Sequence, residues 1–199
     1  MTMNSSEKKL THKDLMGIFW RSFRQDAVWN FERQQNLGSA YTMSRVVGKL
    51  YEDDKEKRAR ALQRHVDFMA ITPHLSTLLY GILAAMEEEN ANNSDFDESS
   101  ISAVRASLMG PIAGIGDSLL WGTLRIIAAG IAISFSQNGS ILGPLLFLLI
   151  INVPCMILRY VCLFKGYELG TSFFKKVLDS GIMDTVTYVA SSIGLMVIG

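Results

Sequence analysis

The sequence predicts an all-α membrane protein with amphipathic N-terminal helices, re-entrant helical hairpins and transmembrane helices. Its 199 residues are 49% hydrophobic and carry no formal net charge, and 29 of its 38 charged side chains lie in residues 1–107. In the second half, glycines, a proline, an aspartate and an arginine interrupt an otherwise apolar stretch. Such residues survive at membrane depth only where protein buries them or where they line a wet cavity.

Residues 1–70 are predicted to form an amphipathic N-terminal arm and polar helices. From Thr11 onward the apolar residues have helical spacing, with basic residues on both flanks. Such a helix either lies flat on a membrane or packs against its own domain, and both interpretations stay open. A second helix over residues 55–69 carries charges of both signs, which is typical of a solvated scaffold helix. The apolar stripe consists of Leu15, Ile18, Phe19, Trp20, Phe23, Ala27 and Val28.

Residues 71–199 are predicted to form a membrane-embedded core. The apolar run after Pro73 is too short to cross a bilayer, which takes about 20 residues, so a re-entrant segment fits better. Glu87 to Glu89 are expected to open a polar loop, and the turn at residues 136–140 separates two spanning segments. In order, we expect a re-entrant segment 73–87, a polar loop 88–100, a broken helix 101–135, a transmembrane helix 141–164 and a transmembrane start 184–199.

Basic residues indicate the orientation of the core. Arg159 and Lys165 follow the second span, whereas the turn at 136–140 has no basic residue. The positive-inside rule therefore puts both ends of the predicted hairpin in the cytoplasm. The sequence reaches Gly199 within an apolar segment, so we expect a truncated C-terminal part or a partner that completes the fold.

The segment WNFERQQN, residues 29–36, holds the densest cluster of recognition-type side chains. On a helix, Trp29, Glu32, Arg33 and Asn36 would share one face. An aromatic ring beside carboxamides and a carboxylate suits a sugar, because the ring packs on C–H groups while hydroxyls need donors and acceptors. The alternative is structural, with Glu32 and Arg33 in ion pairs and Trp29 as an interface anchor.

The glycine-rich run at residues 110–118 resembles a phosphate loop only superficially. It lacks the lysine of such loops and no strand pattern precedes it. An interrupted membrane helix, whose free backbone groups meet a solute or another helix, fits better. Close helix packing is the equal alternative. The structural or pathway candidates here are Gly110, Pro111, Gly114 and Gly116.

Asp117 is the strongest functional candidate in the sequence. Asp117 and Arg125 are eight residues apart, about two helical turns, and can pair with each other or with another subunit. His74, which follows Pro73, is either a relay or a structural hydrogen-bond donor.

Several classes of function find no support in the sequence. Basic residues alternate with acidic ones, which excludes a continuous nucleic-acid-binding face. Cys155 and Cys162 lie in an apolar run without metal-ligand spacing and fit buried small hydrophobic residues. We therefore expect no catalytic residues, no metal and no cofactor.

Long motifs of the chain resemble one family. WRSF, WNFERQQNLG, TPHL, AMEEE, LMGPIAGIGDSLLWGTLR and ILGPLLF are similar to the IID component of the mannose-family sugar phosphotransferase system (PTS), from about Leu10 to the end. The resemblance implies a multi-pass subunit of the bacterial cytoplasmic (inner) membrane. It would bind and translocate a hexose or amino-hexose together with a IIC subunit. IIA and IIB partners would carry out the phosphorylation, so this chain would not be an enzyme on its own.

By position, the resemblance implies sugar-site candidates in the first cluster and at two hairpins. Membrane lipid is a further expected partner, and nucleic acid is not. Related chains continue beyond the equivalent of Gly199. A non-transporting assembly subunit, in which Glu32, Arg33, Asp117 and Arg125 lock IIC in place, and a stand-alone channel remain alternatives. The substrate-binding candidates are Trp29, Asn30, Glu32, Gln35, Asn36, His74, Asp117 and Ser118, with Pro73 and Arg125 added to the glycine-rich residues as structural or pathway positions.

Overall fold

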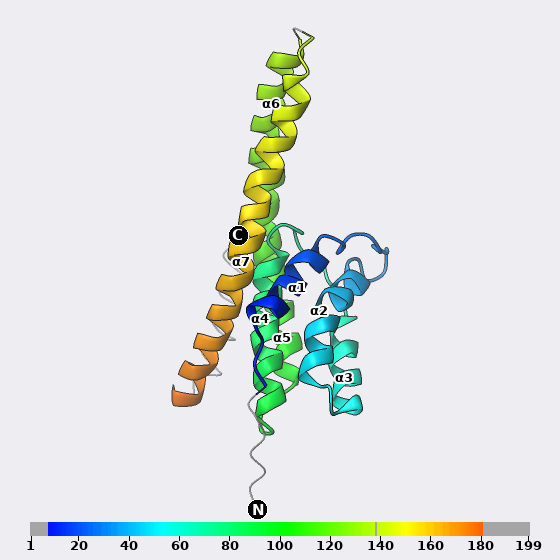
Figure 1. The fold of residues 1–199 in the computed structure, drawn as a ribbon, viewed down its shortest axis with the longest axis vertical. Helices are drawn as coiled ribbons and strands as arrows, with labels where there is room; N and C mark the ends of the chain where they lie inside the picture. The colour runs from blue at the N-terminus through cyan, green and yellow to red at the C-terminus, as the bar shows by residue number, and fades with distance from the viewer. Residues whose placement is uncertain (1–7, 138, 181–199) are drawn as a thin grey trace, which may run out of the picture.

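The computed structural model describes residues 8–137 and 139–180, with side chains up to residue 171. Within them the named elements are all helical, which confirms the all-α prediction. Figure 1 shows a long column with a smaller group of helices, α1 to α3, packed against the side of its lower half. The elements are α1 His12–Ser22, α2 Asn36–Leu50, α3 Lys55–His65, α4 Ser76–Asn92, α5 Ser99–Gly116, the π-helix η1 Asp117–Leu124, α6 Arg125–Ser136 and α7 Leu142–Ser180.

Two long apolar helices form the column. Ser99–Ser136 and Leu142–Thr171 are each long and apolar enough to cross a membrane. In their most apolar windows only 17% and 11% of the residues are buried within the chain, so their apolar side chains face outward. This is the opposite of a core helix in a soluble protein. The predicted turn is confirmed, because α6 ends at Ser136 and α7 begins at Leu142.

The predicted broken helix 101–135 is wrong in one respect, since the helix has no break. Pro111 lies inside α5 without ending it, and α5 continues through η1 into α6. Wider π-helical turns follow over Asp117–Leu124, and such turns often occur at functional sites. The predicted span 141–164 lies almost wholly within α7, which continues to Ser180. The predicted span start 184–199 lies outside the described residues.

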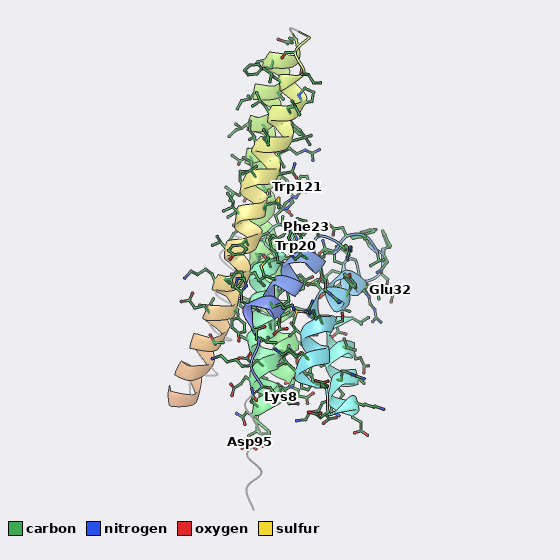
Figure 2. All side chains as sticks on the ribbon, viewed as in Figure 1. Lys8, Trp20, Phe23, Glu32, Asp95 and Trp121 are labelled. Atoms are coloured by element: carbon green, nitrogen blue, oxygen red, sulfur yellow. The ribbon has the colours of Figure 1, made fainter. Side chains whose placement is uncertain are left out.

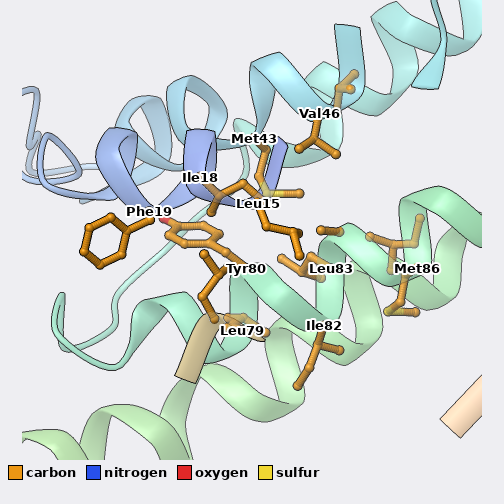
Figure 3. Close-up of a cluster of buried hydrophobic side chains, with 14 of the residues drawn as sticks. Leu15, Ile18, Phe19, Met43, Val46, Leu79, Tyr80, Ile82, Leu83 and Met86 are labelled. Carbon is orange, nitrogen blue, oxygen red and sulfur yellow. The ribbon is translucent and has the colours of Figure 1, made fainter. Parts of the chain in front are cut away.

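The first helix packs against its own domain along one face. Figure 3 shows Leu15, Ile18 and Phe19 of α1 meeting α2 and α4 in a buried cluster. Trp20 is 61% exposed, so the predicted stripe is split between core and surface. Helix α1 ends at Ser22, and Ala27 and Val28 therefore do not continue it. Helix α2 follows the 29–36 cluster, where the sequence analysis had placed no separate helix.

Glu87 does not begin a loop, because α4 runs on to Asn92. The Glu87 side chain is fully buried and bound by Arg64 Nε at 3.1 Å, His65 Nε2 at 3.0 Å and the Tyr51 hydroxyl at 2.6 Å. Burial opposes the charge, but the His65 hydrogen bond and the nearby cations outweigh it and lower the pKa of Glu87. Helix α3 ends at His65, earlier than the predicted Met69, and thereby delivers its last two side chains to Glu87.

Small residues bring α4 and α7 into close contact. A Cβ on Gly81 would overlap the Leu163 carbonyl, and a Cβ on Gly166 would overlap the Leu78 carbonyl. Close approach of helix backbones through glycines is common in membrane proteins. Thr77 Oγ1 also donates to the Arg159 carbonyl at 2.7 Å, which fixes the register of α4 against α7.

Candidate functional site

Polar side chains gather where residues 66–75 cross from α3 to α4. Residues 23–35, η1 and the middle of α7 meet the crossing segment there. Figure 2 shows Phe23 and Trp121 close to this level, at the base of the apolar α6–α7 hairpin. We call this place the junction. Its polar members are Asp26, Gln35, Thr72, His74, Asp117 and Arg159.

The crossing segment is bonded to the start of η1. Thr72 Oγ1 donates to Asp117 Oδ1 at 2.7 Å and also lies 3.1 Å from the Ala113 carbonyl. A Cβ on Gly116 would lie 2.5 Å from Thr72 Oγ1, so only glycine leaves room for this contact. Gly116 therefore has a packing role, and Asp117 is tied to the junction while remaining exposed on the chain's own surface.

Arg159 is the most deeply placed cation of the junction, with 4% of its surface exposed. It donates to Ser22 Oγ at 2.8 Å, and its guanidinium lies 4.6 Å from the Phe23 ring centroid. Its Nη2 is 3.5 Å from His74 Nδ1. Arg159 was predicted to be a basic flank of a membrane span, and the structure adds that its side chain is buried within the chain and bonded to Ser22.

His74 is kept neutral by its surroundings. Burial and the positive charge of Arg159 lower the pKa of His74, while Asp26 opposes them. A neutral ring can accept at Nδ1 from Arg159 and keep its proton on Nε2. The ring centroid of His74 is 6.3 Å from that of Trp121 in η1. His74 therefore links the junction to the hairpin.

The predicted shared helical face at residues 29–36 is absent. The segment forms turns, Gln34 has a φ of 52°, and Asn36 opens helix α2. Trp29 is 52% exposed and the Glu32 side chain 84% exposed. Asn36 is buried instead, and its amide is bonded within the chain. Its Oδ1 accepts from Asn30 at 2.6 Å, and its Nδ2 donates to the Val66 carbonyl at 3.1 Å.

Gln35 ties the same loop to the crossing segment. Its Nε2 donates to Asp26 at 2.8 Å and to the Ile71 carbonyl at 3.0 Å. Its Oε1 accepts from the Ile71 N–H and from Gln25 Nε2, both at 2.9 Å. All polar atoms of this amide are engaged. Gln35, Asn36 and Asn30 therefore position the loop and Asp26 beside the crossing segment.

Arg125 lies on the hairpin side of the junction. Its guanidinium is 5.1 Å from the Trp121 ring centroid, and the residue is exposed. No ion pair with Asp117 forms, so the predicted pairing is wrong; η1 turns the two side chains toward different partners. Among the described residues Arg125 has no carboxylate partner. It helps to line a cavity of about 190 Å³ together with His74, Trp121 and Phe147.

The remaining predicted residues lie around the junction without joining its hydrogen bonds. Ser118 is exposed and donates to the Ile115 carbonyl at 3.1 Å, within its own helix. Gly110 and Gly114 are exposed, and nothing lies within 4 Å of a Cβ built on Gly110. Pro73 precedes α4 and its carbonyl accepts from Ser76 Oγ at 2.9 Å.

Sequence reasoning missed Asp26, Thr72 and Arg159 as site residues. Thr72 stands next to Pro73 and was not among the candidates. Arg159 did carry a signal, because a lone charge in an apolar helix points to a buried partner or a pathway. Asp26 is one of many charged residues in the first half, and nothing in the sequence distinguished it from the others. No group of three His, Cys, Asp or Glu side chains within the described ranges is placed to hold a metal ion.

Comparison with known proteins identifies the family. The family model for the PTS system mannose/fructose/sorbose family IID component matches residues 9–199. The mannose-specific EIID component of Escherichia coli is 37% identical over 198 residues, which cover 100% of this chain and 70% of that protein. The fructose permease IID component of Bacillus subtilis is 40% identical over 193 residues, covering 97% of this chain and 70% of that one.

A solved structure agrees in fold as well as in sequence. The cryo-EM structure of the mannose transporter ManYZ in complex with a microcin contains a chain with a TM-score of 0.90 and 37% identity. The match covers 97% of this chain and 70% of that chain. Sequence, family model and fold agree over almost the whole chain, and the two outward-facing apolar helices fit a membrane component. The chain therefore belongs to the mannose/fructose/sorbose family of PTS IID components, the membrane subunits of a sugar permease.

Proposed function

We propose that this chain binds a hexose or amino-hexose at the junction and moves it across the cytoplasmic membrane together with a IIC subunit. IIB and IIA partners would phosphorylate the sugar. This chain would contribute no phosphoryl-transfer residue and would be non-catalytic. The two apolar helices of this chain would form part of the multi-pass arrangement. Relatives named for mannose, fructose and sorbose are 37%, 40% and 38% identical to this chain, so the family alone does not select one sugar.

The observation that carries the proposal is the bonded pair of Thr72 and Asp117 at the base of an outward-facing apolar hairpin. Next to it lie the His74 ring and the cavity at Trp121. A sugar needs carboxylate and imidazole groups for its hydroxyls and an aromatic face for its C–H groups. All three are within one short stretch of the junction.

The sequence candidates fall into three groups on this basis. Asp117, His74 and Ser118 are assigned direct contact with sugar, because they border the cavity or the exposed start of η1. Asn30, Gln35 and Asn36 are assigned positioning roles, since their amides are engaged in hydrogen bonds. Trp29 and Glu32 are exposed on the loop and would meet sugar only together with the partner subunit.

Substitution of Asp117 by alanine tests this proposal. We expect sugar uptake by cells carrying the complete permease to fall at least roughly tenfold, because loss of a group that hydrogen-bonds a substrate hydroxyl has effects of this size or larger. Co-purification with IIC should persist. Asp95→Ala is the matched control, since Asp95 is an exposed carboxylate on the loop before α5. Unchanged uptake in both Asp117→Ala and Asn36→Ala would overturn the proposal.

A second function, that of a non-transporting subunit that stabilises IIC, is favoured by Arg125. This exposed cation on an apolar helix has no acidic partner among the described residues, which suits a carboxylate on another chain. Arg125→Gln separates the two functions. Loss of uptake only in proportion to loss of bound IIC would support assembly, whereas normal IIC binding with impaired uptake would support transport.

A further inference from the structure

An open groove between α1 and α2 concentrates positive charge on the side of the molecule. The groove has a volume of about 440 Å³, and its lining includes Lys13, Trp20, Arg21, Arg24, Tyr41 and Arg45. No acidic side chain lines it. None of its four cations forms an ion pair with any residue that the structure describes. Cations held together without a counter-charge indicate an anionic ligand.

The arginines are held in place around one aromatic ring. Arg21 donates to the Tyr41 carbonyl at 3.0 Å and to Ser44 Oγ at 2.6 Å, and its guanidinium lies 4.7 Å from the Tyr41 ring centroid. Arg24 donates to the Tyr41 hydroxyl at 2.7 Å. Arg45 crosses over Gly17, where an added Cβ would lie 3.0 Å from Arg45 Cδ. The donors are therefore pre-organised before any ligand binds.

The groove lies about one bilayer thickness from the turn of the hairpin. Helix α1 contacts α7 at Tyr160, whose ring centroid is 6.0 Å from that of Phe19. About 18 residues of helix separate Leu142 from Tyr160, a rise of roughly 27 Å, against roughly 30 Å for the hydrocarbon core of a bilayer. If the polar turn lies at one membrane surface, α1 lies at the other. Trp20 and Phe23 are exposed at that level, as Figure 2 shows.

We propose that this groove binds the phosphodiester headgroup of an anionic membrane lipid such as phosphatidylglycerol. The guanidinium groups match the geometry of phosphate oxygens, which they bind as planar forks. Trp20 and Phe23 occupy the boundary between headgroups and acyl chains, where aromatic residues concentrate. Bound lipid thereby anchors α1 to the membrane surface, and with it Ser22, whose hydroxyl accepts from the junction residue Arg159.

Native mass spectrometry of the full chain, titrated with phosphatidylglycerol or phosphatidylcholine, tests the proposal. We expect tight retention of phosphatidylglycerol over phosphatidylcholine. The triple variant Arg21→Gln, Arg24→Gln, Arg45→Gln should bind phosphatidylglycerol roughly tenfold or more weakly, because each cation near an anionic lipid surface strengthens binding severalfold. A matched variant, Lys55→Gln, Lys57→Gln, Arg58→Gln, removes as many charges from α3 and should bind like the unmodified chain.

Three outcomes would overturn the proposal. Equal weakening in the α3 variant would mean that only the net charge matters. Equal retention of the two lipids would show that the groove does not recognise the anionic headgroup. Displacement of bound phosphatidylglycerol by millimolar glycerol phosphate or inorganic phosphate would identify a site for soluble phosphate. The double variant Lys13→Gln, Arg45→Gln leaves the Tyr41 contacts intact and tests the groove should the triple variant fail to fold.

Discussion

Two regions of the molecule differ in where their side chains find contacts: one packs them within the chain, and the other turns them outward. The foot, which we define as residues 8–108, buries ion pairs such as Arg64–Glu87 and closes a hydrophobic core between α1, α2 and α4. The hairpin, residues 117–158, exposes its apolar side chains and leaves Arg125 without a carboxylate partner among the described residues. The foot encloses its core within the chain, although the cations of the groove between α1 and α2 have no counter-charge among the described residues. The hairpin instead presents an apolar surface suited to lipid or a partner chain.

This contrast locates the junction physically. Polar groups of the foot reach the base of the hairpin through residues 66–75 and through Arg159. In the proposed function, the junction is where fixed hydrogen-bonding groups of the foot would meet the sugar.

Glu87→Gln should have the largest effect on stability. The substitution leaves Arg64 and His65 buried without their shared carboxylate, and breaking a buried ion pair in this way costs about 3–5 kcal/mol. The thermal unfolding of the purified chain should shift to a markedly lower temperature. Glu89→Gln is the control, because Glu89 is partly exposed two residues away. If the two variants melt alike, the foot is not held by its buried charges.

Leu148→Lys should impair membrane insertion of the hairpin. Leu148 is 55% exposed on the apolar surface of α7, and a lysine near the centre of a membrane helix costs about 2.5–3.5 kcal/mol. Leu37→Lys, at a residue 48% exposed in the foot, should cost little because water can solvate the charge. Glycosylation mapping of inserted segments measures both. Equal insertion of the two variants would contradict a lipid-facing or partner-facing hairpin.

Alanine substitution at two glycines of α5 should change the stability of the chain in opposite directions. Gly116→Ala forces its Cβ against Thr72 Oγ1 and should destabilise the chain by about 1–3 kcal/mol, the usual cost of overpacking. Gly110→Ala meets nothing within 4 Å and should stabilise the helix by about 0.5–1 kcal/mol. Denaturation midpoints compare the pair. A stabilising Gly116→Ala would show that Thr72 is not held against η1.

The smallest expected effect is a pH dependence due to His74. Its folded-state pKa is lowered from the ordinary value of 6.5, so below that pH the unfolded chain binds a proton that the folded chain does not. Stability from this group is therefore present above pH 6.5 and falls on acidification toward the lowered pKa, by at most about 1.4 kcal/mol per pH unit. In the His74→Gln variant, the melting temperature should fall less on acidification below pH 6.5 than it does in the unmodified chain. Equal falls in the two proteins would contradict the prediction.

Much of the fold could be predicted from local patterns. The charge asymmetry, the apolar runs and the turn at residues 136–140 predicted the outward-facing hairpin. Those features depend on a segment's own composition. Glu87 was misassigned to a loop because three consecutive carboxylates look solvent-exposed unless the cations that bind one of them are known. Arg64 and His65 are more than twenty residues away in the chain.

The site was less predictable than the fold. The sequence singled out Asp117, His74 and Gly116, since charge, imidazole and small residues are unusual in apolar surroundings. It did not reveal that Thr72 bonds Asp117 or that Arg159 bonds Ser22, because these pairs are 45 and 137 residues apart. It also suggested a helical face for Trp29 to Asn36, where hydrogen bonds to residues 66–71 impose turns instead.

By itself, the sequence determined that the second half of this chain is helical, apolar and suited to a membrane, because composition and periodicity act locally along each helix. Only the tertiary structure decided which polar groups share the junction and which merely hold it in place. Gln35 and Asp117 look equally suited to sugar in the sequence. Distant backbone carbonyls and N–H groups saturate the Gln35 amide, whereas one threonine occupies only part of the Asp117 carboxylate.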